Sequence, residues 1–207
     1  MIAVTLTWIL AYGVIAPPTT PYIVSESRRL GGVERAWVDW EDIAPVMARS
    51  VVAAEDANFC LHWGVDMSAL RAAIDDGGNR GASTISQQTV KNVFLWHGRS
   101  YARKALEAVM TPMVELFWSK ERILEVYLNM IEYDEGVFGI EAASLHYFGL
   151  PAHDLSPGQA AALAAVLPNP KGRSASKPSR REQRRARAIA DGAETIRRDG
   201  RAECFED

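Results

Sequence analysis

Residues 41–64 read EDIAPVMARSVVAAEDANFCLHWG, and they join an apolar helical pattern to a group of polar side chains. The apolar positions recur every three or four residues, which predicts an amphipathic helix through Ala54. Glu55 and Asp56 stand at the end of that pattern, and His62 follows Glu55 by seven residues. Two adjacent carboxylates in this place are either a solvated helix end or part of a site that carries out chemistry.

The same periodicity predicts further helices in residues 65–74, 81–95, 101–118, 119–131, 137–149 and 155–170. Thr84 and Gln87 have the spacing of a capping box, so a helix is expected to begin there. Ser156 and Gln159 have the same spacing, with Pro157 at the first helical position. Alternation of β-branched residues is almost absent. The predicted fold class is therefore mainly α.

The composition is that of one globular domain with a basic tail. The chain has 207 residues, of which 48% are hydrophobic and 24% charged, with a net charge of −3. Residues 171–207 hold 11 Lys and Arg against 7 Asp and Glu, and the other 170 residues hold 12 against 19. A basic tail can face phospholipid headgroups or nucleic acid, although composition alone favours a soluble, partly helical tail. Cys60 and Cys204 show no metal-ligand spacing and are predicted to be free thiols.

The N-terminal residues 1–16, MIAVTLTWILAYGVIA, carry no charged side chain. As a helix the segment would rise about 22 Å, which is short of the roughly 30 Å hydrocarbon core of a bilayer. A signal peptide would carry basic residues before its apolar stretch, and none precedes this segment. We therefore predict the outer end of a truncated transmembrane anchor, joined by a connector at 17–36 to a domain at 37–170. The alternative is a buried amphipathic helix, but the segment has no polar face.

Polar side chains at helical spacing form two charged stripes. Arg103 and Glu107 are four residues apart, and Gln87 and Lys91 are also four apart, so each pair shares a helix face. Taken alone, such pairs are ordinary surface contacts worth about 0.3–0.5 kcal/mol. Their number, however, gives a carboxylate pair in the company of several cations. Glycosidic chemistry uses two carboxylates, and cations favour a phosphate leaving group over simple hydrolysis.

Several motifs in order make the pattern specific. EDANFCLHWG (55–64), GASTISQQTVKN (81–92), RKALE (103–107) and KERILEVYLN (120–129) resemble the successive signatures of the peptidoglycan glycosyltransferase family. GVFGIEAASLHYFG (136–149) and AALAAVLPNP (161–170) also match in order. The resemblance covers about residues 37–170 and is closest to the monofunctional, membrane-anchored branch. It implies a lysozyme-like, two-lobed, mainly α domain in which the smaller lobe near the membrane helps to hold the lipid.

The resemblance also implies roles for individual residues. Glu55 would be the general base on the acceptor 4-hydroxyl, and Glu107 the second essential carboxylate, on the pyrophosphate side. The residues expected to bind pyrophosphate are Lys91, Arg103 and Lys104. Those expected to position sugar and phosphate oxygens are Ser83, Thr84, Gln87 and Gln88. Supporting roles are expected for Asp56, Phe59, His62 and Asn92.

The implied substrate is lipid II, a disaccharide-pentapeptide on undecaprenyl pyrophosphate, and the implied reaction inverts the anomeric centre to extend a β-1,4 glycan strand. The resemblance leaves room for a divalent cation, Mg²⁺ or Mn²⁺, at Glu107, and it implies no organic cofactor. The expected partners are lipid II, the growing glycan strand, the cytoplasmic membrane and proteins of division or elongation, without nucleic acid. The catalytic domain is expected on the periplasmic side of the inner membrane, held there by a single pass.

Two other functions stay open on the sequence. One is a lysozyme-type lytic enzyme that cleaves the same glycan with an acidic Glu. The other is a membrane-tethered helical scaffold without activity. The cation cluster of Lys91, Arg103 and Lys104 favours polymerisation over cleavage, because cleavage does not need it.

Overall fold

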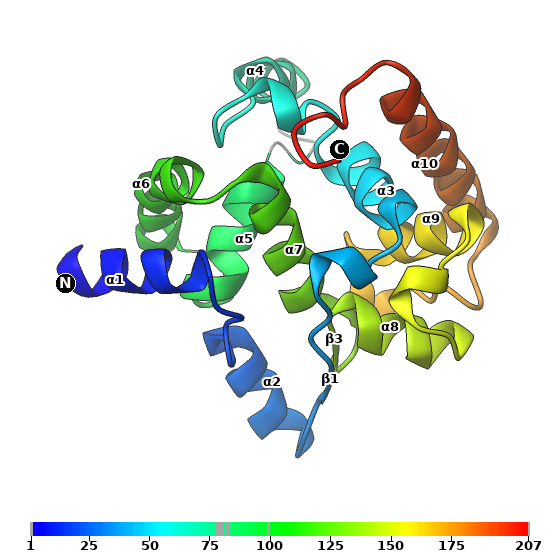
Figure 1. Cartoon of the computed structure of the whole chain (residues 1–207), viewed down its shortest axis with the longest axis horizontal. Helices are drawn as coiled ribbons and strands as arrows, with labels where there is room; N and C mark the ends of the chain where they lie inside the picture. Colours follow the sequence, from blue (N-terminus) through cyan, green and yellow to red (C-terminus); the bar gives the residue numbers. More distant parts are fainter. Residues whose placement is uncertain (1, 78–80, 82, 99, 207) are drawn as a thin grey trace.

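The computed structural model describes residues 2–77, 81, 83–98 and 100–206 of the chain. The fold is mainly helical, which confirms the predicted class. Its α-helices, shown in Figure 1, are α1 (Ile2–Tyr12), α2 (Pro21–Leu30), α3 (Pro45–Glu55), α4 (Met67–Asp75), α5 (Ile85–Phe94), α6 (Tyr101–Phe117), α7 (Lys120–Met130), α8 (Ile140–Phe148), α9 (Pro157–Val166) and α10 (Arg180–Arg198). Short 3₁₀ turns are η1 (Trp40–Asp42), η2 (Phe59–Leu61), η3 (Ala152–Asp154) and η4 (Pro170–Gly172).

A small sheet joins the connector to the body of the domain. Its strands are β1 (Glu34–Arg35), β2 (Glu132–Asp134) and β3 (Val137–Phe138), in the order β1-β3-β2. β1 pairs with β3 in parallel, with Glu34 opposite Val137, and β2 pairs with β3 antiparallel through an irregular register. The sheet therefore fixes the start of the chain against the segment that follows α7.

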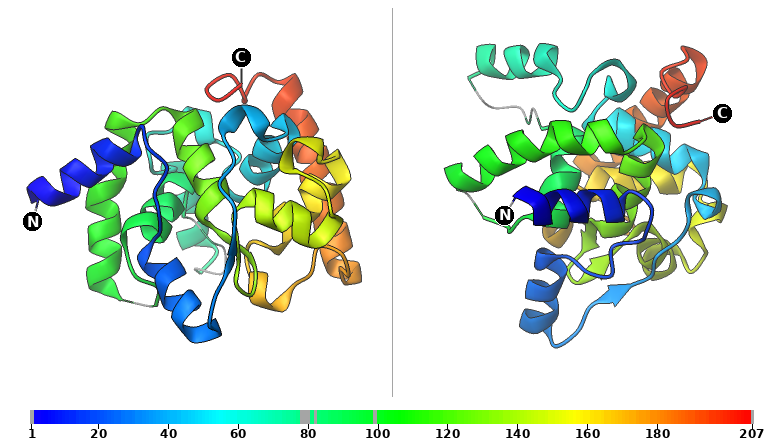
Figure 2. Two further views of the ribbon diagram at one scale, coloured as in Figure 1. Left: turned by 60° about the horizontal axis from the view of Figure 1, so that its bottom comes forward. Right: turned by 60° about the vertical axis from the view of Figure 1, so that its left-hand side comes forward.

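The helices form two packed groups. α3, α9 and α10 contact one another in one group, and α5 contacts both α6 and α7 in the other. Figures 1 and 2 show α1 lying along α6, on the side of the molecule away from α9 and α10. The two carboxylates predicted to be catalytic fall in different groups, since Glu55 ends α3 and Glu107 lies within α6.

Helix α7 forms the buried centre of the domain. Each residue from Ile123 to Met130 is buried, so this helix has no solvent-facing stripe. One polar side chain among them, Asn129, is satisfied because its amide accepts from Val38 N at 2.9 Å and donates to Val38 O at 2.9 Å. Buried amides need such partners. Asn129 thereby fixes the segment that follows β1 to the central helix.

The predicted helix starts are confirmed. Thr84 and Gln87 form a capping box at α5, and Ser156 and Gln159 form another at α9, where Pro157 takes the first helical position. These signals are local, because a cap side chain bonds to backbone groups only a few residues away. Pro112 lies inside α6 without ending the helix.

The uncharged N-terminal segment forms α1. Within the part of the chain that the structure describes, no helix combines the length and the apolar character needed to cross a bilayer. Ile9 is fully buried, and its carbonyl accepts a hydrogen bond of 2.7 Å from Trp118 Nε1. Arg122 donates to the carbonyls of Tyr12 and Ile15, which fastens the end of α1 to the start of α7.

The prediction that Cys60 and Cys204 are free thiols was wrong. The two cysteines form a disulfide across 144 residues of sequence, with their Cα atoms 5.6 Å apart. The pairing arises because α10 packs on α3 and returns the end of the chain to the loop that carries Cys60. Phe205 is buried there against Phe59, with ring centroids 6.3 Å apart. Spacing in the sequence gives no sign of such a contact.

Removing this disulfide should lower the free energy of unfolding. A cross-link that closes so long a loop restricts the unfolded chain strongly, and its loss typically costs about 2–5 kcal/mol. We expect the double variant Cys60→Ala/Cys204→Ala to unfold at lower denaturant concentration than the oxidised wild type, as followed by circular dichroism. Reductant should destabilise the wild type and leave the double variant unchanged; equal stability of oxidised wild type and double variant would contradict the prediction.

Candidate active site

Glu55 is the last residue of α3, and its carboxylate lies between the two helix groups. The side chain is only 15% exposed. Its Oε2 atom accepts a hydrogen bond of 3.1 Å from Gln88 Nε2 on α5. Its Oε1 atom lies 3.5 Å from Arg185 Nη2 on α10, a residue that the sequence did not single out. The carboxylate thus faces a different helix with each oxygen.

Burial sets the protonation of Glu55. Removal from water raises the pKa of the Glu55 carboxyl above its ordinary value, because the charged form loses hydration. The hydrogen bond from Gln88 and the positive charges of Arg185, Lys91 and Arg173 oppose that rise without cancelling it. A carboxylate with an elevated pKa is a better proton acceptor at neutral pH than an ordinary surface Glu.

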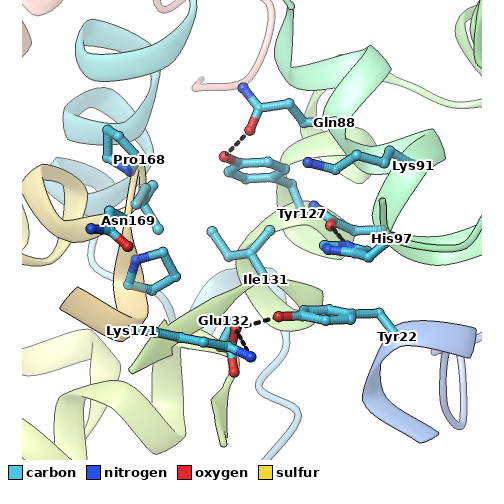
Figure 3. Close-up of a pocket in the computed structure, with 13 residues that line it drawn as sticks. Tyr22, Gln88, Lys91, His97, Tyr127, Ile131, Glu132, Pro168, Asn169 and Lys171 are labelled. Carbon is cyan, nitrogen blue, oxygen red and sulfur yellow. Dashed lines mark hydrogen bonds and ion pairs between the residues drawn. The ribbon is translucent and has the colours of Figure 1, made fainter. Parts of the chain in front are cut away.

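Gln88 connects Glu55 to the buried centre of the domain. Its amide nitrogen donates to Glu55 and also to the carbonyl of Ser83 at 3.3 Å. Its amide oxygen accepts from the hydroxyl of Tyr127 on α7 at 3.0 Å, as Figure 3 shows. Tyr127 is buried and lies within the KERILEVYLN motif, which is the sequence signal that could have identified it. The orientation of the Gln88 amide is therefore fixed from both ends.

A cavity of about 290 Å³ opens beside Gln88 and Lys91. Its far wall is a Tyr22–His97 ring stack with centroids 3.5 Å apart, and His97 Nε2 lies 2.9 Å from the Asn92 side-chain oxygen (Figure 3). Burial lowers the pKa of His97 to about 4, so this ring is neutral at neutral pH. Asn92, predicted to be a supporting residue, thus orients a wall of the cavity.

Glu107 is the second carboxylate, and its environment differs from that of Glu55. Its side chain is 3% exposed, and its Oε2 accepts from Arg103 Nη1 at 2.7 Å. Its Oε1 accepts from Lys104 Nζ, which also lies 3.4 Å from Ser83 Oγ. Two cations on one buried carboxylate leave a surplus of positive charge, and the Lys104 side chain is 49% exposed. This cluster can attract an anion while Glu107 holds the cations in place.

Lys91 is electrostatically coupled to both carboxylates. Burial lowers the pKa of its ammonium group, while the negative charges of Glu107 and Glu55 favour the charged form. No hydrogen bond or ion pair holds the Lys91 ammonium to another described residue, although it lines the cavity beside Gln88. Its three N–H donors are therefore available to a bound ligand.

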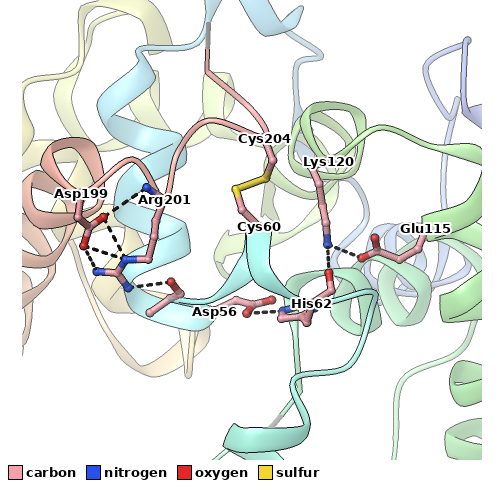
Figure 4. Close-up of a disulfide and its surroundings, with 9 residues drawn as sticks. Asp56, Cys60, His62, Glu115, Lys120, Asp199, Arg201 and Cys204 are labelled. Carbon is pink, nitrogen blue, oxygen red and sulfur yellow. Dashed lines mark hydrogen bonds and ion pairs between the residues drawn. A yellow bond between two sulfur atoms is a disulfide. The ribbon is translucent and has the colours of Figure 1, made fainter.

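Asp56 fastens the end of α3 to the start of α5. Its Oδ2 accepts from the backbone N–H of Ile85 at 2.9 Å, and its Oδ1 lies 2.8 Å from His62 Nε2 (Figure 4). Ile85 is the first residue of α5, where unpaired N–H groups and the helix dipole favour a carboxylate. The structure thus places His62 against Asp56 and not against Glu55.

The loop after Asp56 is held by Lys120 and Phe59. Lys120 Nζ donates to the His62 carbonyl at 2.9 Å and to Glu115 at 2.8 Å (Figure 4). The same ammonium stands 4.3 Å from the centre of the fully buried Phe59 ring, which is the geometry of a cation–π contact. Phe59 therefore serves packing. Lys120 is a positioning residue to which the sequence analysis gave no role, although it is the first residue of the KERILEVYLN motif.

Two residues predicted to position the substrate, Thr84 and Gln87, form the N-terminal cap of α5 instead. The Thr84 hydroxyl accepts from Gln87 N and donates to the Gly64 carbonyl at 2.6 Å, while the Gln87 amide oxygen accepts from Thr84 N. Gly64 itself has φ of +83°, and a Cβ there would stand 2.7 Å from the Thr111 methyl of α6. Thr84 and Gln87 are buried in this junction, which leaves Ser83 and Gln88 on the open side of the motif.

The predicted metal ligand does not have the surroundings of a cation site. Among the residues described, no three His, Cys, Asp or Glu side chains come together as potential ligands. Divalent ions require several oxygen ligands, and both oxygens of Glu107 already accept from cationic side chains. The donor set does not fit a resident divalent cation, and we derive no step through one.

Loss of the Asp56 carboxylate should destabilise the junction of α3 and α5. In Asp56→Ala, the Ile85 N–H and the His62 ring lose their acceptor, at a cost of about 2–3 kcal/mol. Urea unfolding should show this loss, and Asp56→Asn, which keeps one acceptor oxygen, should fall between the alanine variant and the wild type. The exposed carboxylate of Glu41 provides the control, since Glu41→Ala should change stability by less than about 0.5 kcal/mol. An Asp56→Ala protein as stable as this control would refute the role of Asp56.

Comparison with known proteins agrees with this geometry. The family model described as transglycosylase matches residues 24–194. A biosynthetic peptidoglycan transglycosylase of Jannaschia sp. (strain CCS1) is 64% identical over 203 residues, covering 98% of this chain and 85% of its own length. A protein of the same name from Caulobacter vibrioides is 46% identical, covering 95% of this chain and 87% of its own length. One from Pseudomonas fluorescens (strain SBW25) is 49% identical, with 93% and 84% covered. The chain therefore belongs to the transglycosylase family.

Proposed function

We propose that the chain is a peptidoglycan glycosyltransferase that polymerises lipid II into β-1,4-linked glycan strands and releases undecaprenyl pyrophosphate. The observation that carries the proposal is the pairing of two unlike carboxylates. Glu55 is mostly buried with an elevated pKa, and Glu107 is buried and paired with Arg103 and Lys104. Membership of the transglycosylase family and the names of the relatives support the same activity.

In this proposal Glu55 takes the proton from the acceptor 4-hydroxyl. The Gln88 amide holds one carboxylate oxygen, while the other oxygen has only a weak contact at 3.5 Å with Arg185. That second oxygen can accept a hydrogen bond from a sugar hydroxyl. Attack by the activated hydroxyl on the donor anomeric carbon, from the face opposite the leaving group, inverts the centre in one displacement.

The leaving pyrophosphate would be received by Lys91, Arg103 and Lys104. Phosphate departs as an anion, so preorganised cations stabilise its developing charge without a general acid. Lys91 brings ammonium donors that no described side chain occupies, and Lys104 is half-exposed next to the Ser83 hydroxyl. Glu107 keeps Arg103 and Lys104 ordered and so assists at the pyrophosphate side.

We infer a lysozyme-like, two-lobed arrangement from the two helix groups, with the lipid along the group that contains α6. Exposed large apolar side chains gather there and on α1, namely Trp8, Leu10, Leu106, Val109, Leu116 and Phe117. Such a surface suits a polyprenyl chain or the membrane interface. The disulfide favours an oxidising compartment, which supports catalysis on the periplasmic side of the cytoplasmic membrane. Division or elongation proteins are the partners expected in that location.

A lytic, lysozyme-type activity is the second candidate, because a buried Glu with an elevated pKa also suits a general acid. Such an enzyme would protonate a glycosidic oxygen and would have no use for the cations around Glu107. A scaffold without activity would have no use for either carboxylate. The products distinguish all three functions.

Purified protein incubated with labelled lipid II in detergent should give long glycan strands, separated by gel electrophoresis. The same protein should not fragment preformed peptidoglycan. Fragmentation without polymer would establish the lytic function, and neither product would leave the scaffold as the function of the chain.

Replacing Glu55 with Gln should abolish turnover and keep the fold. Loss of a general base typically lowers the rate by about 10²–10⁴-fold. Because the pKa of Glu55 is raised in the folded state, the folded protein binds the proton more tightly than the unfolded chain does. The free energy of unfolding therefore falls as pH rises from the pKa of Glu55 in the unfolded chain to its higher pKa in the folded protein. The neutral Gln avoids that penalty, so Glu55→Gln should be at least as stable as the wild type at pH 7 in thermal unfolding.

The pH dependence provides a second measurement on the same residue. Wild-type turnover should fall as pH is lowered through the elevated pKa of Glu55, at a higher pH than an ordinary Glu would give. The residual activity of Glu55→Gln should lack this limb. Unchanged turnover in the Gln variant would refute the assigned base.

A further inference from the structure

A second cavity, of about 320 Å³, lies between the first turns of α10 and the segment after η4. Its lining consists of Arg173, Arg181, Glu182 and Arg185. None of these residues belongs to the motifs that assign the catalytic or pyrophosphate-binding roles. The cavity therefore calls for an explanation of its own.

The cavity is lined by three positively charged hydrogen-bond donors and one carboxylate acceptor. Arg173 Nε is 3.8 Å from Glu182 Oε1, a loose contact, and Arg173 Nη1 donates to the Ala165 carbonyl at 2.9 Å. Arg185 makes only contacts of 3.4–3.5 Å through Nη2, and its Nε is buried with no hydrogen-bond partner in the described chain. Arg181 has no ion pair with a described residue. Three guanidinium groups around one carboxylate make an anion-binding cavity.

The cavity adjoins the proposed base on the side away from the pyrophosphate cations. Arg185 faces Glu55 Oε1 from α10, whereas Gln88 and the cation cluster approach from α5 and α6. A substrate whose hydroxyl meets Glu55 would therefore place its neighbouring groups within reach of the arginines. In the proposed reaction the hydroxyl that meets Glu55 belongs to the acceptor, so the groups that reach the arginines are groups of the acceptor.

The surface around the cavity indicates which anion it takes. The exposed large apolar side chains of the described chain lie at or before Leu145, and none lies on α9, η4 or α10. A pyrophosphate that carries a polyprenyl chain needs exposed apolar surface close by, and α9, η4 and α10 offer no large exposed apolar side chain. A carboxylate on a water-soluble peptide needs none, and guanidinium groups bind carboxylates through paired N–H donors.

We propose that Arg173, Arg181 and Arg185 bind a carboxylate of the acceptor's stem peptide and so position its sugar hydroxyl on Glu55. The proposal rests on the proposed glycosyltransferase function and adds a subsite to it. Arg185 is then a positioning residue that contacts both the base and the peptide end of the acceptor. The consequence is a preference for substrates with free peptide carboxylates.

The test compares lipid II with free stem-peptide carboxylates and lipid II with those carboxylates amidated, the lipid and pyrophosphate being identical. Wild-type protein should show a KM about tenfold higher for the amidated substrate, with kcat nearly unchanged, as expected for one charge-assisted contact. Arg181→Gln should raise the KM for the free-acid substrate by a similar factor, so that this variant has nearly equal KM values for the free-acid and amidated substrates. Arg187→Gln is the matched control, since Arg187 is an exposed arginine of α10 that does not line the cavity.

A soluble muramyl peptide without lipid or pyrophosphate gives an independent readout. It should inhibit polymerisation by the wild type and by Arg187→Gln, and inhibit Arg181→Gln about tenfold less. Equal KM values for both substrates in the wild type would overturn the carboxylate subsite while leaving polymerisation established. A loss in Arg181→Gln that is the same for both substrates would assign the cavity to the acceptor's pyrophosphate and overturn the proposal. Absence of polymer from any substrate would instead refute the proposed function.

Discussion

The carboxylate of Asp56 is the constraint on which the site depends. It accepts from the first N–H of α5 and from His62, so it fixes the end of α3 to the start of α5. Glu55 is the adjacent residue, and its backbone cannot move independently of this junction. The contact of 3.1 Å between Glu55 and Gln88 is therefore set by the neighbour of the proposed base. A carboxylate at a helix N-terminus is well suited to this work, because it satisfies an N–H donor that the helix leaves unpaired.

The two acidic residues differ in their surroundings, and this difference separates their roles. Glu55 loses hydration and gains only the 3.5 Å contact with Arg185, so the effect of burial dominates and its pKa rises. Glu107 is buried more deeply, but two cationic side chains accompany it. Carboxylates in unlike environments can act as a proton acceptor and as a fixed charge within one site. Lys91 feels both negative charges and links the two regions electrostatically.

The sequence predicted those features whose cause is local. Capping boxes at Thr84 and Ser156 were recognised because cap and helix lie within three residues of each other. The motif residues Glu55, Gln88, Lys91 and Glu107 were found through a resemblance, and Lys91 is coupled electrostatically to both carboxylates in the structure. The Cys60–Cys204 disulfide and the contact of Arg185 with Glu55 were missed, because each joins residues more than 120 positions apart. Helical periodicity carries no information about which distant helices meet.

The C-terminal segment shows why net charge is a weak guide to the surface that a segment presents. Its surplus of Lys and Arg raised the prospect of contact with lipid headgroups or nucleic acid. Several of these arginines bond inward, however: Arg173 donates to the Ala165 carbonyl, Arg201 to the Ala57 carbonyl, and Arg185 lies against Glu55. The disulfide and the buried Phe205 hold the end of the chain against the loop that follows Glu55 and carries Phe59 and Cys60. A segment with no motif of its own thus supplies positive charge to the proposed base, and its folding onto α3 couples the last residues of the chain to the chemistry of the site.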